Sequence, residues 1–458
     1  MRVRPSDSTA GILPFALLVC AFFFSFFYRI SAAVVLPQLA TEWSMSATLT
    51  GLISSLYFYS YALMQPLSGV LNDRHGPLFI GSVGLVVTAG GALCFAFAQV
   101  PATIAVGRLL TGLGLSSFLS GAVAYQNATF PPEKYAFYSG LTLLVGNLGA
   151  AVSVSPLGAA LDRWGRASVF SVLCVVTLGL AAAMFSLRRR DIVVIAIKAR
   201  HRKDGLSESE LAERKPAQDN GAGQSLAVQL KSAFLTVARS WPLRSIILVW
   251  FVSFGALMSA QGLWAVEWCK AAYAASDPTA RGWSSMFTLG VMAGNALGSR
   301  MAAGIEARRA AVSYSSLACA IAWAMLWVGI GLSWPLALTA VFALFVGAAS
   351  GFSYTHMTAA VSNLAPVGQR GSIFGVVNAF PSLGAIAMQW ATGSILSAHH
   401  ATEPGAIPSA SFYSKSDFQV AFAFVVAMAI ISQLALIGLT GFEREARAAS
   451  GEVCEKSA

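Results

Sequence analysis

Charged residues are scarce in this chain. Only 11% of its 458 residues are Asp, Glu, Lys or Arg, whereas 56% are hydrophobic. A soluble domain contains about 25% charged residues, and the mean hydropathy of this chain is +0.66. The composition therefore excludes a soluble globular protein and predicts an integral, polytopic membrane protein.

Acidic residues are scarcer than basic ones, with 20 against 30, which leaves a formal net charge of +10. Such an excess can indicate nucleic-acid binding. Here, however, the basic residues mostly lie between hydrophobic segments, which is typical of membrane topology rather than of a binding face. We therefore expect the lipid bilayer, and no nucleic acid, as a partner.

Motifs for catalysis, cofactors and metals are missing as well. The six cysteines are scattered, five of them in apolar stretches, and no CxxC occurs. This indicates packing thiols rather than disulfides or metal ligands. No nucleotide-binding loop, nucleophile motif or metal-ligand spacing is present. The sequence argues against an enzyme and against a primary pump, and we expect no cofactor.

What the chain does contain is about twelve segments long enough to cross a membrane, which takes about 20 apolar residues. The N-terminal run imitates a secretory signal, but it is too long and contains Arg29, so we interpret it as a retained first helix. The fold class is thus all-α and polytopic. We expect the helices at 11–38, 48–71, 78–99, 101–126, 136–160, 167–187, 243–271, 282–303, 312–330, 334–357, 371–397 and 416–441.

One long polar stretch, Arg188 to Ser240, divides these segments into two sets of six. We predict a first six-helix bundle over 1–190, a basic cytoplasmic linker over 191–242, a second bundle over 243–442 and a cytoplasmic tail over 443–458. Small residues such as Gly290, Gly294 and Gly298 share helix faces. They indicate close helix packing, either static or in helices that slide.

The basic residues also predict the orientation, because cytoplasmic loops are enriched in Lys and Arg. With both termini cytoplasmic, the inner loops hold most of the basic residues, and we expect a bacterial inner membrane. The loops at 162–166 and 270–281 are charged exceptions on the outer side. The inner set comprises the central stretch with Arg74, Lys134, Arg300, Arg308, Arg309 and Arg370.

A loop motif follows the second segment, with the sequence Gly69-Val-Leu-Asn-Asp73-Arg74-His-Gly76-Pro77. It resembles the signature loop of the major facilitator superfamily, G-x-x-x-D-R-x-G-[RK], and departs from it at Pro77. In this interpretation Gly69 permits close helix approach, Asp73 accepts hydrogen bonds from a neighbouring helix N-terminus, and Arg74 pairs across the bundle or with lipid phosphate. The loop would act as a conformational latch; the alternative is a solvated turn.

Other motifs extend this resemblance over nearly the whole chain. Arg108-Leu-Leu-Thr-Gly112 resembles the R-x-x-x-G motif of the fourth helix, and Pro366-Val-Gly368-Gln-Arg370-Gly371 resembles the P-x-x-x-R-G pattern after the tenth. Within the superfamily the chain is similar to uncharacterised bacterial members and, more weakly, to organic-anion and sugar-phosphate transporters. The resemblance implies two bundles around a central cavity that work by alternating access.

Arg29 is the leading candidate for substrate binding. It lies in an apolar stretch without an acid, and an arginine at membrane depth costs at least ~2.5–3.5 kcal/mol on insertion scales. Its planar fork suits carboxylate or phosphate. The alternative is an internal hydrogen-bond anchor. Further residues that could line the cavity are Tyr57, Tyr61, Gln65, Gln261, Trp264 and Asn378.

Three residues are candidates for coupling to a proton or ion. Arg108 resembles a position linked to proton coupling in the superfamily, although a structural bond is an equal alternative. Glu267 could titrate in the membrane, but Lys270 follows one turn later and could simply pair with it. His356 could relay protons near neutral pH, or it could be a packed, hydrogen-bonded histidine.

The sequence therefore predicts a secondary active transporter for a small, anionic organic solute. Two alternatives stay open at this point. An exporter of hydrophobic or cationic compounds would need acids that face its cavity, and these are scarce. A membrane sensor on the same scaffold would bind a ligand without moving it.

Overall fold

The computed structural model describes residues 8–130, 135–190, 226–301, 304–366, 370–402 and 413–450. Over these residues the chain is helical, with no strand. This is the expected solution in hydrocarbon, where each helix satisfies its own backbone donors and acceptors. The predicted all-α class is confirmed.

The first half makes six membrane crossings. A break at Ser31 divides the first into α1 (Ser8–Ile30) and α2 (Ala32–Glu42). The fifth contains α7 and the start of α8, since Gly165, at φ 74°, kinks α8 and leaves its remainder as the sixth. The other elements are α3 (Ala47–His75), α4 (Pro77–Phe97), α5 (Pro101–Leu115), α6 (Phe118–Thr129), α7 (Tyr135–Val152), α8 (Ser155–Leu187) and η2 (Arg188–Arg190).

The second half makes six more crossings, so the predicted total of about twelve is confirmed over the described residues. Nine spans are long and apolar enough by themselves. The crossings that contain α3, α7 and α14 are shorter or more polar. The elements are α12 (Trp241–Ser259), η3 (Ala260–Trp264), α13 (Ala265–Tyr273), α14 (Asp277–Arg300), α15 (Ile305–Gly331), α16 (Leu336–Leu364), α17 (Arg370–His400), α18 (Lys415–Ser432), η4 (Gln433–Gly441) and α19 (Phe442–Ser450).

A helix also lies inside the range that we predicted as a linker. Residues 191–225 are outside the described part of the chain, but α11 (Leu226–Arg239) follows them. It buries Ala233 and Val237 in the core of the second bundle. In the predicted tail, α19 continues to Ser450, and residues 451–458 are not described.

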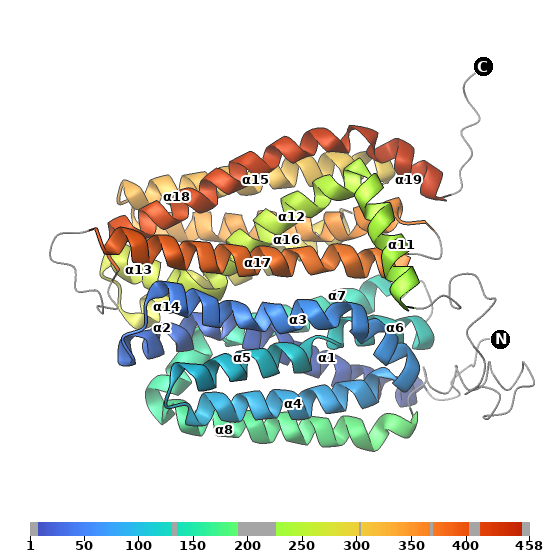
Figure 1. Cartoon of the computed structure of the whole chain (residues 1–458), viewed down its shortest axis with the longest axis horizontal. Helices are drawn as coiled ribbons and strands as arrows, with labels where there is room; N and C mark the ends of the chain where they lie inside the picture. The colour runs from blue at the N-terminus through green and yellow to red at the C-terminus, as the bar shows by residue number, and fades with distance from the viewer. Residues whose placement is uncertain are drawn as a thin grey trace, which may run out of the picture.

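The two halves lie side by side as two bundles, with α3 against α17 and α7 against α14 at their boundary (Figure 1). We call the end that holds α11, α19 and the start of α1 the linker end, on the right of Figure 1, and the other the distal end. Within the second bundle, a Cβ at Gly290 or Gly294 would overlap the backbone of α16. These glycines therefore allow close packing of α14 against α16.

Candidate substrate cavity

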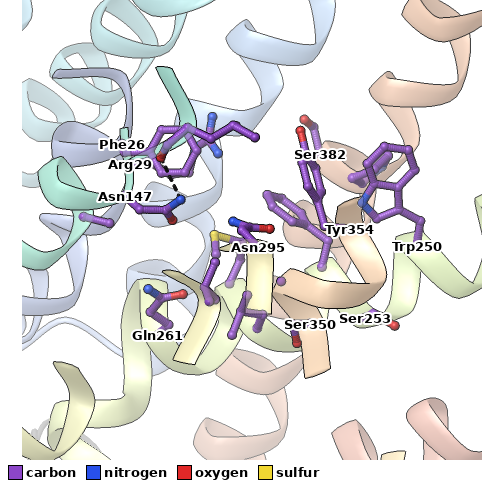
Figure 2. Close-up of a pocket in the computed structure, with 18 of the residues that line it drawn as sticks. Phe26, Arg29, Asn147, Trp250, Ser253, Gln261, Asn295, Ser350, Tyr354 and Ser382 are labelled. Carbon is purple, nitrogen blue, oxygen red and sulfur yellow. Dashed lines mark hydrogen bonds between the residues drawn. The ribbon is translucent and has the colours of Figure 1, made fainter. Parts of the chain in front are cut away.

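A cavity of about 100 Å³ lies between the two bundles. The first bundle contributes residues of α1, α3, α6 and α7, and the second contributes residues of α12, η3, α14, α16 and α17. Figure 2 shows Phe26, Arg29 and Asn147 on one side of it, with Trp250, Tyr354 and Ser382 on the other. A site made by both bundles can couple binding to their relative movement.

Arg29 reaches this cavity because of its place on α1. Phe22, Phe26, Arg29 and Ile30 recur at helical spacing, so they share one face of the helix, and all four line the cavity. Arg29 is the one charged side chain among the described residues that line it. The sequence prediction that Arg29 faces a conduit rather than lipid agrees with this placement.

The guanidinium of Arg29 is surrounded by aromatic rings instead of acids. Its Cζ lies 4.6 Å from the centre of the Phe26 ring, 5.1 Å from Tyr61 and 5.9 Å from Tyr57. The side chain is 8% exposed, and its Nε atom is buried without a hydrogen-bond partner. None of the ion pairs among the described residues includes it. Cation–π contacts compensate part of the lost hydration, but the positive charge has no counter-ion.

Arg108 differs from Arg29 in both position and partners. It is fully buried, does not line the cavity, and donates to the backbone oxygens of Tyr28 at 2.7 Å and Ser54 at 2.7 and 3.3 Å. Arg108 thereby ties α5 to α1 and α3, which is the structural alternative that we considered. Its coupling role stays a prediction.

The other predicted cavity residues divide into two groups. Tyr61, Gln261 and Asn378 line the cavity. Gln65 lies beside it and accepts a hydrogen bond from the Asn378 amide at 3.4 Å, across the bundle boundary. Two others are packing residues outside the lining. Tyr57 is fully buried and donates to the Ser25 carbonyl oxygen at 3.0 Å, and Trp264 donates to Thr392 at 3.2 Å.

Glu267 and His356 also lie away from the cavity. Glu267 pairs with Lys270 at 3.1 Å near the distal end, in a separate hollow of about 300 Å³. His356 is buried on α16, with its ring 4.5 Å from that of Phe352, and its Nε2 has no partner. The structure therefore brings none of the three coupling candidates into the cavity.

The signature loop joins α3 to α4 at the linker end. Gly76 has φ 86°, a value that favours glycine, and Pro77 occupies the first turn of α4, where a missing N–H costs little. A Cβ at Gly69 would meet no described atom within 4 Å in this conformation, and its role in close helix approach stays a prediction. The side chains of Asp73 and Arg74 lie outside the described part. Their neighbour Asn72 donates to the Ser117 carbonyl oxygen at 3.0 Å.

Several residues of the cavity wall were missed by sequence reasoning. On α16, positions 350, 353, 354 and 357 recur at the spacing of one helix face, as positions 254, 257, 258 and 261 do on the seventh crossing. That periodicity was the available signal. The missed polar and aromatic residues are Phe22, Phe26, Trp250, Ser253, Phe254, Asn295, Ser350, Ser353, Tyr354 and Ser382.

The distal end is closed by contacts between the bundles. Arg281 on α14 forms two hydrogen bonds with Asp162 on α8, at 2.5 and 3.0 Å, although Arg281 is only 3% exposed. Beside α3, the backbone N–H groups of Ala47 and Thr48 donate to Tyr413 at 2.7 Å and to Ser397 at 3.1 Å. The Arg281–Asp162 pair joins the two charged loops that were exceptions to the basic-residue bias.

Comparison with known proteins identifies the family. The family model described as Major Facilitator Superfamily matches residues 17–389, which is most of the chain. The chain belongs to the major facilitator superfamily. Membership of this family indicates a membrane transporter rather than an enzyme.

Several sequence relatives are named as transporters. The chain is 31% identical over 110 residues to an uncharacterised transporter, YybO, of Bacillus subtilis, covering 24% of this chain. It is 25% identical to a probable sulfoacetate transporter of Cupriavidus necator and 28% identical to a hexuronate transporter of B. subtilis, each over 34% of this chain. The matched regions span only 25% to 37% of these relatives' own lengths.

Two solved structures share the fold over nearly the whole chain. A bacterial homologue of the human lysosomal transporter Spinster, in an inward-facing and unoccupied conformation, has a TM-score of 0.68 at 13% identity and covers 99% of this chain and 100% of its own. A D-xylose–proton symporter has a TM-score of 0.67 at 14% identity, with 94% and 97% covered. At these identities the likeness concerns the superfamily fold alone.

Proposed function

We propose that this superfamily member is a secondary active transporter for a small organic anion, and that Arg29 binds the anionic group. The observation that supports this most is the lone, unpaired charge of Arg29 in a cavity shared by both bundles. A buried cation without a counter-ion is unfavourable. An anionic substrate would supply the missing negative charge, so its binding would gain the electrostatic attraction to Arg29 that the empty cavity lacks.

The alternatives fit the cavity less well. An exporter of cationic compounds needs acids at the site, and the described lining has none. A sensor would bind the anion equally well, so only transport separates the two. Two relatives are named for organic anions, one as a probable sulfoacetate transporter and one as a hexuronate transporter. This agrees with an anionic substrate.

We further propose that the linker end faces the cytoplasm of a bacterial cell, in the inner membrane, with both termini inside. The basic bias supports this orientation. In that frame the closed distal end is the outer gate, and the structure corresponds to an inward-facing state. An impermeant thiol reagent applied to intact cells tests the orientation. A Ser225→Cys variant that reacts from outside above the background of the parent chain would reverse it.

Transport itself is tested in proteoliposomes that contain the purified chain. We expect counterflow of at least one radiolabelled organic anion among benzoate, a hexuronate and sulfoacetate, and loss of that counterflow in Arg29→Gln at equal reconstituted amount. An Asn378→Asp variant adds an acid to the same wall and should also slow anion uptake. Binding without counterflow would indicate a sensor. Uptake that speeds up under an imposed pH gradient would indicate proton coupling, for which Arg108, Glu267 and His356 remain the candidates.

A further inference from the structure

We propose that the substrate carries a single negative charge, on a planar carboxylate head, and has a compact and largely apolar body. This inference rests on the proposed function, since it specifies the anion that the Arg29 cavity would take. It narrows the proposed substrate class, because it excludes anions with two or more charges as substrates and disfavours substrates with a polyhydroxy body.

The charge count comes first. One guanidinium can neutralise one charge, and the described lining holds no second Lys, Arg or His. Asn147, Gln261, Asn295 and Asn378 are neutral amides. A second carboxylate or a phosphate dianion would enter a poorly hydrated space with one charge uncompensated, which is strongly unfavourable. The cavity should therefore discriminate by charge number and not only by sign.

The head group follows from the surroundings of Arg29. Phe26, Tyr61 and Tyr57 lie 4.6 to 5.9 Å from the guanidinium carbon, whereas the Nε at one edge has no partner. An edge of this kind presents parallel N–H groups, which match the two oxygens of a carboxylate. A lysine could supply the charge but not this edge.

The body follows from the opposite wall. Beyond Arg29 the cavity is bounded mainly by apolar side chains from both bundles, among them Phe22, Trp250, Phe254 and Met258. Such walls favour a ring or a branched hydrocarbon through dispersion and exclusion of water. Polar side chains on these walls can orient a body through hydrogen bonds, whereas the larger apolar share of the walls disfavours a body covered with hydroxyls. These polar side chains are Ser253, Asn295, Ser350, Ser353, Tyr354 and Ser382.

Four small probes test the inference, with thermal unfolding of the purified full chain and its tryptophan fluorescence as readouts, since Trp250 lines the cavity. Benzoate has one charge and one ring, and benzamide is its neutral isostere. Isophthalate adds a second charge on the same ring, and a hexuronate keeps one charge on a polyhydroxy body. We expect benzoate to bind at least about tenfold more tightly than each of the others. We also expect Arg29→Gln to abolish that preference.

The outcomes separate the inference from the proposed function. If isophthalate binds as tightly as benzoate, the single-charge inference is overturned, while anion transport stands. If the hexuronate binds and benzoate does not, the apolar body is overturned. If benzamide equals benzoate, both the inference and the anion proposal fail. If none of the four binds, the inference is overturned, and counterflow of sulfoacetate decides the proposed function separately.

A charge-adding variant controls for the larger size of isophthalate. Asn295 is half-buried on α14, in the wall made by the second bundle. In Asn295→Lys a second cation enters the cavity, and we expect isophthalate to gain at least about tenfold in affinity relative to benzoate. Asn295→Gln, the neutral control, should keep the original order. An unchanged order in a folded Asn295→Lys protein would show that charge number does not set the preference.

Discussion

The central cavity and the distal end each hold a buried arginine, and the two arginines have different neighbours. Arg281 at the distal end is 3% exposed and contacts two carboxylates, Asp162 across the bundle boundary and Asp277 on its own helix at 3.3 Å. Arg29 is 8% exposed, lies among the aromatic residues Phe26, Tyr57 and Tyr61, and contacts no carboxylate among the described residues. Arg281 links the two bundles through its own carboxylate partners, whereas Arg29 has no carboxylate partner among the described residues, as its proposed binding role requires.

Arg108 is a third buried arginine, and it shows that burial alone does not indicate a ligand-binding role. It is the most deeply buried of the three, yet backbone carbonyl oxygens occupy its donors. Burial by itself therefore does not predict a binding role. The partners of the guanidinium do, and the predictions below vary those partners.

The largest effect is expected for Arg29. Arg29→Gln should weaken binding of the anionic substrate by roughly thirtyfold to several-thousandfold, because truncating one partner of a buried charged contact costs about 2–5 kcal/mol. Arg29→Lys keeps the positive charge but loses the planar guanidinium, so its anion affinity should lie between those of the parent and Arg29→Gln. The measurement is affinity per folded molecule. Because the empty site holds an uncompensated charge, the thermal stability of ligand-free Arg29→Gln should be equal to or higher than that of the parent.

A different result for Arg29→Gln would remove the contrast between Arg29 as a ligand-binding residue and Arg108 as a structural one. If the variant folds poorly and its surviving fraction keeps the parent affinity, Arg29 is a structural anchor like Arg108. Arg108→Gln is the matched control, since it removes the hydrogen bonds of Arg108 to two backbone carbonyl oxygens. It should lower the stability of the ligand-free protein and leave the affinity per folded molecule nearly unchanged.

The next effect concerns the distal ion pair. Arg281→Gln leaves Asp162 without its cross-bundle partner and should destabilise the closed distal end by about 1–3 kcal/mol, a moderate value because Asp162 is 49% exposed. A cysteine placed at Ser155, whose hydroxyl contacts Ser285 at 3.2 Å, should react faster with thiol reagents. The exchanged pair Asp162→Arg with Arg281→Asp should restore slow labelling. Equal labelling in all variants would show that this pair does not hold the end closed.

Much of the fold could be predicted from the sequence. Each membrane crossing needs a long apolar helix, so the number of crossings can be counted from the apolar segments. The exceptions were segments governed by packing, such as α11, whose polar residues resembled a linker while Ala233 and Val237 are buried. In the site, Arg29 was predictable because an unpaired charge in an apolar run is rare. Tyr57 and Trp264 were not separable from cavity residues, because an aromatic side chain suits a packed core and a cavity wall equally.

A smaller effect is expected at the signature loop. Asp73→Asn should slow counterflow about fivefold or more while leaving anion affinity nearly unchanged, if the loop stabilises one conformation as the motif predicts. Comparing affinity and counterflow on the same preparation checks this. Asp73→Glu, which keeps the charge, is the matched variant. Unchanged counterflow in both, at equal reconstituted amounts, would remove the latch hypothesis and leave the loop as a solvated turn.

The smallest effect is expected for Glu267. Its carboxylate is partly exposed and pairs with Lys270, which also contacts Asp277 at 3.1 Å, so Glu267→Gln leaves the lysine one partner. Exposed pairs contribute little, and the free energy of unfolding should change by no more than about 0.5 kcal/mol. Anion affinity should stay unchanged, because Glu267 lies outside the central cavity. The sharper readout is uptake driven by an imposed pH gradient, measured beside counterflow without one. If Glu267→Gln loses the driven uptake and keeps the counterflow, the distal end carries coupling chemistry as well as closure. The division between paired structural charges and the free charge of Arg29 would then no longer hold.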